Sequence, residues 1–208
     1  VIFSLSLPNI YKSDALLKIV EESNNSSNLA SNYGALASLA GIDLQSGAGA
    51  DKGDYVIEVI KSRGFLKHLL TFDDVLPQLM AAKSYDINAK ETIYDSEIYD
   101  SKNNKWVREP TKTKKIIPTY LEVYEDYIGE YIEIEKDSKT GFISISVKHI
   151  SPQFSYYFLN LIINEANNIE RLKDQKSSKD SLEYLNNQLI LTNLSELRLA
   201  ISALVESQ

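Results

Sequence analysis

The sequence contains no cysteine, and its 208 residues include only two histidines. Without cysteine the chain has no disulfide, no thiolate nucleophile and no cysteine-ligated metal. His68 and His149 lie far apart, and neither has a second histidine at the spacing of a zinc site. The patterns of phosphate-binding loops, zinc proteases, serine hydrolases and EF-hands are also absent. We therefore expect no cofactor and no metal.

Long apolar runs and an excess of positive charge are also missing. No stretch approaches the roughly 18–20 apolar residues of a membrane span, and no signal peptide is recognisable. Because the chain begins with Val1, we expect a fragment or a mature product whose membrane anchor lies outside these residues. The formal net charge is −7, and the densest basic run, Lys112, Lys114 and Lys115, is short. Nucleic-acid binding is therefore disfavoured.

The first two thirds of the chain mix short predicted elements. Residues 3–7 alternate like a half-buried strand that ends at Pro8, and 15–20 favour a second strand. Residues 21–28 and 45–53 are predicted loops around a helix at 29–44, whose small residues suit close packing. Further helices are predicted at 54–70, with Val56, Val59, Ile60 and Leu66 on one stripe, at 73–80, and from the cap Thr119 to Tyr127. We interpret 86–115 as loop.

The last third carries the clearest patterns. Residues 131–135 and 142–147 alternate and are joined by a turn ending in Gly141, which predicts a β-hairpin. Ser151-Pro152 then starts a helix, and no proline or glycine follows as far as Gln208. Apolar residues recur at helical spacing on both sides of a polar stretch at 173–180. A continuous helix over 152–208 would be about 85 Å long.

These elements predict an α+β fold. Residues 1–150 are expected to form an α/β base domain that contains the β-hairpin and helical insertions. Residues 151–208 are expected to form a very long helix that packs partly on the base and extends away from it. Because the polar stretch would be solvated on all sides, we expect another chain to cover it.

Two side-chain clusters have both a functional and a structural interpretation. The carboxylates of Glu122, Glu125, Asp126 and Glu130 could serve a glycosidase, but their spacing favours the exposed face of a helix. Seven of the 13 tyrosines gather in the middle third, where aromatic faces could stack on sugars. We favour half-buried core edges and subunit contacts for them; they are Tyr85, Tyr94, Tyr99, Tyr120, Tyr124, Tyr127 and Tyr131.

Four stretches, in order along the chain, resemble one family. They are LPNIYKSDALL at 7–17, NYGALASLAGI at 32–42, IKSRGFL at 60–66, and TGFISIS at 140–146 followed by Ser151-Pro152. The sequence resembles the Wzz-type chain-length determinants of bacterial surface polysaccharides, also called polysaccharide co-polymerases. The stretch at 32–42 is the most specific of the four.

The resemblance implies the following. Such proteins have a membrane helix at each end, enclosing a periplasmic region with a membrane-proximal base and a long helix. They form ring-like homo-oligomers in the bacterial inner membrane and set the modal length of O-antigen, capsule or exopolysaccharide. They act with a Wzy-type polymerase and the growing polysaccharide, and are not enzymes. Both membrane helices would lie outside this sequence.

Cations near the polar middle of the long helix are the site residues that we predict. They could face the interior of the oligomer and meet a growing, often acidic, glycan; solvation or ion pairing between protomers is the plain alternative. These residues are Arg171, Lys173, Lys176 and Lys179.

Two other classes of protein stay open. A periplasmic adaptor of an export system would have two antiparallel helices of similar length. A carbohydrate-active enzyme would have a carboxylate of perturbed pKa in a cleft.

Overall fold

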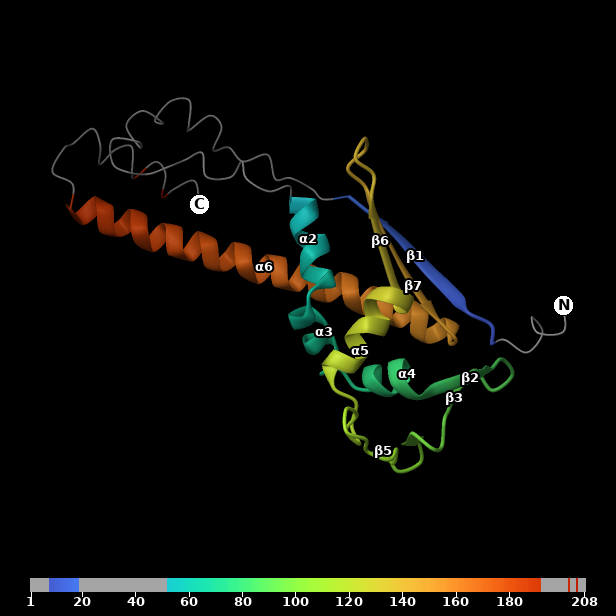
Figure 1. Cartoon of the computed structure of the whole chain (residues 1–208). Coiled ribbons are helices and arrows are strands. Elements are labelled where there is room, and N and C mark those ends of the chain that lie inside the picture. The colour runs from blue at the N-terminus through green and yellow to red at the C-terminus, as the bar shows by residue number, and fades with distance from the viewer. Residues whose placement is uncertain (1–7, 19–51, 192–201, 203–204, 206–208) are drawn as a thin grey trace. The chain divides into compact units, whose positions relative to one another are not determined.

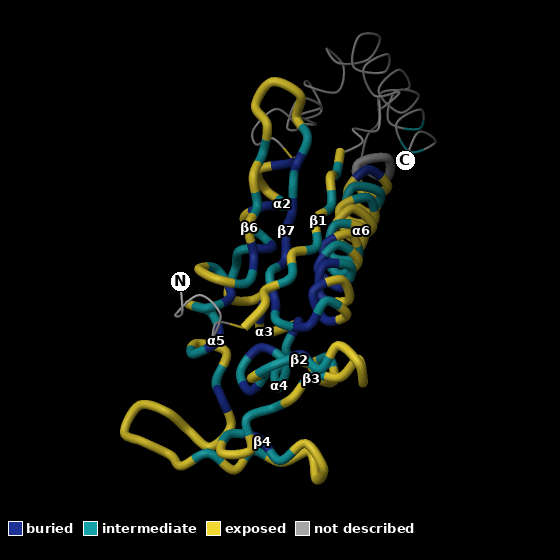
Figure 2. The backbone as a smooth tube through the Cα atoms, turned by 90° about the vertical axis from the view of Figure 1, so that its right-hand side faces the viewer, coloured by how far each residue is buried: buried dark blue, intermediate teal, exposed yellow. Residues whose placement is uncertain are grey.

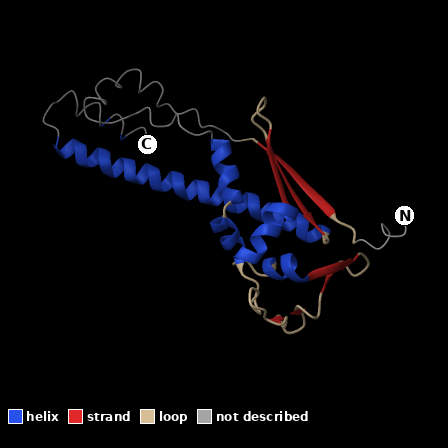
Figure 3. Ribbon diagram, in the orientation of Figure 1, coloured by secondary structure: helices blue, strands red, loops and turns tan. Residues whose placement is uncertain are grey.

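The computed structural model describes residues 8–18, 52–191, 202 and 205. The chain divides into two compact units, one of Val1–Ile19 and Gly53–Ala166, the other of Val20–Lys52 and Asn167–Gln208. The mixed α+β class is confirmed, with antiparallel sheets and a long C-terminal helix (Figures 1 and 3). In chain order the elements are β1 (Tyr11–Leu17), α2 (Lys52–Lys61), α3 (Arg63–Leu69), α4 (Val75–Ala81), β2 (Ala82–Asp86), β3 (Glu91–Tyr94), β4 (Tyr99–Asp100), β5 (Lys105–Trp106), α5 (Tyr120–Asp126), the π-helical turn η2 (Tyr127–Tyr131), β6 (Ile132–Lys136), β7 (Ile143–His149) and α6 (Pro152–Leu191).

The largest sheet is antiparallel, in the order β1-β7-β6. β6 and β7 form the predicted hairpin, and the turn between them needs Gly141, whose φ of 72° favours glycine. β1 pairs with β7 from Tyr11↔His149 to Leu17↔Ile143. This strand lies after Pro8 and overlaps the strand predicted at 15–20 only at its end. The predicted strand at 3–7 and the small-residue helix at 29–44 lie outside the described residues.

The two faces of this sheet differ in polarity. Alternate residues of β7 are buried on the face that packs on the start of α6: Ile143, Ile145, Val147 and His149. Figure 2 shows the buried parts of β7 and α6 in dark blue. Across this face Ser13 and Ser155 share a hydrogen bond of 2.8 Å. On the other face Lys12 and Lys148 both pair with Glu133. One side of the sheet therefore lies on the core and the other is polar.

Helix α6 begins as predicted. Pro152 is its first residue, and the Ser151 hydroxyl accepts a hydrogen bond from the Phe154 amide at 3.2 Å. Within the first unit its buried apolar side chains are Phe154, Phe158, Leu159, Leu161, Ile162 and Ala166. The helix is described as far as Leu191, 40 residues in all, which corresponds to about 60 Å. The predicted continuation to Gln208 falls mostly outside the described residues.

The single helix predicted at 54–70 is wrong, because Ser62 divides it. Ser62 has an extended backbone (φ −73°, ψ 149°), and its hydroxyl accepts from the Phe65 amide at the start of α3. The predicted stripe is confirmed only in part, for Ile60 and Leu66. Ile57, Ile60, Phe65, Leu66 and Leu69 are buried, whereas the predicted stripe residues Val56 and Val59 are only half-buried.

Tyrosine hydroxyls donate to carbonyls at the C-terminal ends of α2 and α4. Tyr127 donates to the carbonyl of Ile60 at 3.0 Å and Tyr124 donates to that of Lys61 at 2.9 Å, both in the last turn of α2. Tyr131 donates in the same way to Leu79 in α4, at 2.6 Å. The last carbonyls of a helix have no partner within it, so these three phenols satisfy groups that would otherwise be buried unpaired. Tyr124 and Tyr131 are thus half-buried at the edge of the core, as predicted, and Tyr127 is fully buried within it, whereas the predicted subunit contacts stay a prediction.

The loop predicted at 86–115 is wrong in part. β2 and β3 form one small antiparallel sheet, and β4 and β5 form another, with Tyr99 opposite Trp106. Their sequences are too short for alternation to be visible. Aromatic packing takes its place, since the rings of Tyr99 and Trp106 lie 5.0 Å apart and those of Tyr94 and Tyr99 lie 5.4 Å apart. The predicted short helix at 73–80 corresponds to α4 and is confirmed.

Candidate functional site

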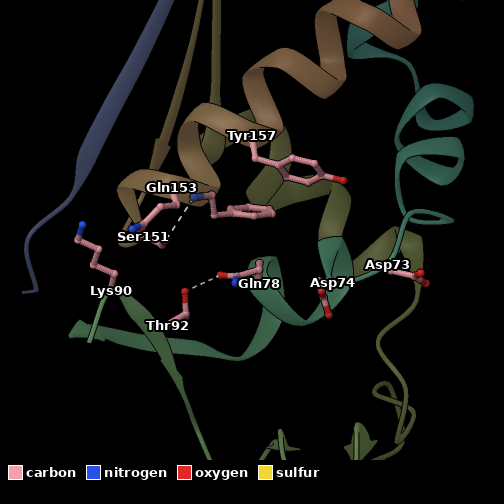
Figure 4. Close-up of a pocket in the computed structure, with 9 residues that line it drawn as sticks. Asp73, Asp74, Gln78, Lys90, Thr92, Ser151, Gln153 and Tyr157 are labelled. Carbon is pink, nitrogen blue, oxygen red and sulfur yellow. Dashed lines mark hydrogen bonds between the residues drawn. The ribbon is translucent and has the colours of Figure 1, made fainter. Parts of the chain in front are cut away.

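A hollow of about 490 Å³ opens between α4, β3 and the first turns of α6 (Figure 4). This volume falls within the range of small-molecule sites, roughly 300–1,000 Å³. Phe154 and Tyr157 bring aromatic rings to it from α6, and Asp73 and Asp74 bring carboxylates from the approach to α4. It lies entirely within the first unit.

Two hydrogen bonds hold Gln78 at the centre of this hollow. Its side-chain oxygen accepts from the Thr92 hydroxyl at 3.1 Å, which links α4 to β3. Its backbone carbonyl, 2.9 Å from the His149 ring nitrogen Nε2, accepts from that nitrogen. The amide of Gln78 is therefore positioned by contacts from two other elements, as expected of a preformed polar wall.

The combination of groups suits a hydroxyl-rich ligand. Tyr157 is 45% exposed and lines the hollow, whereas Phe154, whose ring centroid lies 6.2 Å from that of Tyr157, is buried. A flat aromatic face packs on the apolar face of a ring, and carboxylate and amide side chains pair with hydroxyl groups. The hollow thus combines the kinds of side chain that contact a sugar-like ring.

Sequence reasoning missed this site. It treated Asp73 and Asp74 only as the start of a helix and Ser151 only as a cap, and it did not single out Tyr157. One feature of the sequence could have pointed to Tyr157. It lies three residues after Phe154, beside the apolar stripe that continues to Phe158, but it carries a polar hydroxyl. The approach of β3 to α6, which closes the hollow, had no signal in the sequence.

His149 is a buried neutral imidazole behind the hollow. Its Nδ1 accepts the Ser151 amide at 3.0 Å, so the proton belongs on Nε2, which donates to Gln78. Burial lowers the pKa of His149 below its ordinary 6.5, and the backbone contacts with Gln78 and Ser151 only partly oppose this. The unfolded chain therefore binds a proton more readily than the folded one near this pH.

We expect the free energy of unfolding to fall as the pH drops through 6.5, because the histidine of the unfolded state is then protonated first. Urea denaturation at about pH 7.5 and 5.5 measures this, and His149→Gln should lose less stability over that window than wild type. His68→Gln is the control, since His68 contacts Glu165 at 2.6 Å on the surface. Equal pH slopes in wild type and His149→Gln would contradict the prediction.

The four cations predicted as site residues are exposed. At 100° per residue they follow one another around α6 in the order Lys173, Lys176, Lys179 and Arg171, and together they span about 200° of its circumference. Arg171 donates to Asn168 at 2.9 Å. Asp174 lines one surface hollow together with Arg171 and Lys179 and reduces its positive charge.

Within the part of the chain that the structure describes, no group of three His, Asp or Glu side chains is placed to hold a metal ion. Among the same residues, none of the helices combines the length and apolar character needed to cross a membrane.

Comparison of the chain with models of known protein families and with curated proteins finds no match. The resemblance to chain-length determinants therefore rests on the four stretches of sequence. Of these, 8–17, 60–66 and 140–152 are described, and in the last of them β7 is followed by α6. The stretch at 32–42 lies outside the described residues.

Proposed function

We propose that this chain is the periplasmic part of a chain-length determinant for a bacterial surface polysaccharide. It acts without catalysis, as a ring-like homo-oligomer in the inner membrane, together with a Wzy-type polymerase. Its membrane helices lie outside these residues. The proposal is supported by the ordered sequence resemblance and by one structural observation, the character of α6.

The observation that carries the proposal is the exposed middle of α6. From Arg171 to Asp180 every residue is exposed except Ser178, which is half-buried, and nine of these ten residues are polar. A helix that is polar all round offers no apolar face for packing. Association with neighbouring copies would cover this stretch, and membrane confinement of the protomers favours such association.

Deletion of the gene tests the proposal. We expect the surface polysaccharide still to be made but to lose its modal length, because the polymerase remains while the regulator is absent. Gel electrophoresis of the polysaccharide measures this, with complementation by the full-length gene as control. An unchanged band pattern, or the complete loss of polymer, would contradict the proposed role.

Two adjacent tyrosines give a matched pair of variants in the same strain. Tyr157 lines the hollow, whereas Tyr156 is 67% exposed and does not. If the hollow contacts the growing polymer, Tyr157→Ala should shift the modal length and Tyr156→Ala should leave it unchanged. Immunoblotting for equal protein levels separates this effect from instability. Equal effects of the two variants would remove the hollow from the mechanism.

A further inference from the structure

One segment of the first unit has a charge opposite to that of the whole protein. Residues 100–117 contain six lysines and arginines and two carboxylates, Asp100 and Glu109, a formal net charge of +4. The whole chain has a net charge of −7. Figure 2 shows much of the chain next to β4 in yellow, the colour of exposed residues. Positive charge is therefore concentrated on one exposed segment.

Apolar side chains are exposed at the end of the same segment. Ile116 and Ile117 are 47% and 58% exposed, and they directly follow Lys112, Lys114 and Lys115. Val107, nine residues before Ile116, is also exposed. Single exposed apolar residues are ordinary, but neighbouring ones beside a cluster of cations indicate an interaction surface. We call residues 107–117 the basic loop.

The basic loop is held in shape by its own hydrogen bonds. The Arg108 side chain donates through Nε to the Ile116 carbonyl at 3.0 Å and through Nη2 to Glu122 of α5 at 2.8 Å. The Thr111 amide donates to the Lys114 carbonyl at 2.8 Å. Ile117 precedes the buried Pro118, which restricts its backbone to extended conformations. The isoleucines are thus presented to solvent by a defined structure.

We infer that the basic loop docks on an anionic lipid surface. Lysines near such a surface are attracted to its negative potential, and the adjacent isoleucines insert among the acyl chains. A nucleic acid or a soluble acidic polymer would use the lysines but leave the isoleucines in water. The inference is independent of the proposed function, since lipid binding by this chain requires neither a polymerase nor a glycan.

Vesicle co-sedimentation of the 208-residue chain tests the inference. We expect binding to vesicles of phosphatidylglycerol and phosphatidylcholine in equal parts, weaker binding as sodium chloride is raised, and little binding to pure phosphatidylcholine. Each lysine is worth about fivefold in partitioning, so Lys112→Gln, Lys114→Gln and Lys115→Gln together should weaken binding on the order of a hundredfold. Absence of binding to the anionic vesicles overturns the inference.

The chain supplies matched controls for both kinds of change. Lys173→Gln, Lys176→Gln and Lys179→Gln together alter the net charge equally at exposed positions of α6, and should change binding less than twofold. Ile116→Ser with Ile117→Ser should abolish most binding, whereas Leu16→Ser with Leu172→Ser, also at exposed positions, should not. Circular dichroism verifies that every variant is folded.

Three other outcomes would also overturn the inference. The first is an equal loss of vesicle binding in the two triple-lysine variants, which would show that binding depends only on the net charge of the chain. The second is full vesicle binding by the double isoleucine variant, together with equally tight binding to dextran sulfate, which indicates a site for soluble polyanions. The third is self-association in sedimentation velocity that the isoleucine changes abolish, which assigns the loop to a second copy of the chain.

Discussion

Phe158→Ala is expected to lower the free energy of unfolding by about 3–5 kcal/mol, the range for removing a buried phenylalanine from a core. Phe158 is fully buried, stacks on Phe154 with ring centroids 5.2 Å apart, and meets the edge of Tyr127 at 6.2 Å. Phe158 therefore packs α6 against Tyr127, whose hydroxyl donates to the Ile60 carbonyl at the end of α2. The loss combines the transfer of the ring to solvent with the cavity that remains.

Urea denaturation followed by tryptophan fluorescence measures this loss. Trp106 is the only tryptophan and belongs to the same unit as Phe158, so its signal reports on the unfolding of that unit. Tyr156→Ala is the matched control, two residues earlier on the exposed side of α6, and should change stability by less than about 0.5 kcal/mol. A loss below about 1 kcal/mol for Phe158→Ala would show that this part of the core is loosely packed.

The ion pair between Arg108 and Glu122 is expected to have the second largest effect. The side chains are only 13% and 15% exposed, and their atoms lie 2.8 Å apart. Removing one partner of a fully buried pair costs roughly 3–5 kcal/mol, because the other charge is left uncompensated. Since solvent still reaches this pair, we expect about 2–3 kcal/mol for Arg108→Met or for Glu122→Gln.

A double-mutant cycle separates the pair from its surroundings. If the two side chains act together, the double variant should be less destabilised than the sum of the single variants by about 1–2 kcal/mol. Additive losses would mean that each residue acts through other contacts, such as the Ile116 carbonyl for Arg108 or the Thr119 amide for Glu122. The same urea titrations provide the measurement.

Acid should weaken this pair. Burial alone would raise the pKa of Glu122, but the Thr119 amide and the Arg108 guanidinium outweigh it and hold the pKa below 4.5. Because the folded pKa is the lower one, the contribution of Glu122 to stability is present above about pH 4.5 and is lost as the pH falls further. The pH range therefore differs from that of His149, whose contribution is lost as the pH falls below 6.5.

The sequence resemblance and the structure lead to different proposals about this protein. The resemblance proposes a role, and the exposed polar middle of α6 is the feature that this role would explain. The hollow beside Tyr157 and the basic loop come from the structure instead. The predicted role of Arg171, Lys173, Lys176 and Lys179 on α6 stays a prediction; at 100° per residue the four side chains spread over about 200° of the helix.

Local signals in the sequence determined several elements by themselves. Ser151 and Pro152 mark the start of α6, Thr119 and Glu122 mark the start of α5, and Gly141 permits the turn between β6 and β7. Each signal acts on backbone groups only a few residues away, through a hydrogen bond, a fixed φ or the absence of a side chain. Such effects are the same in any fold, so they can be read without tertiary contacts.

The Ser62 cap is a local feature, but only the tertiary structure decided that the helix at 54–70 breaks there and where the hollow forms. The break at Ser62 is stabilised by the Tyr127 hydroxyl, which reaches the Ile60 carbonyl from 67 residues away. The hollow depends likewise on α4, β3 and α6, which meet only after folding. Satisfying a buried carbonyl or closing a cavity requires partners brought close in space, and their distance along the chain leaves no periodic pattern.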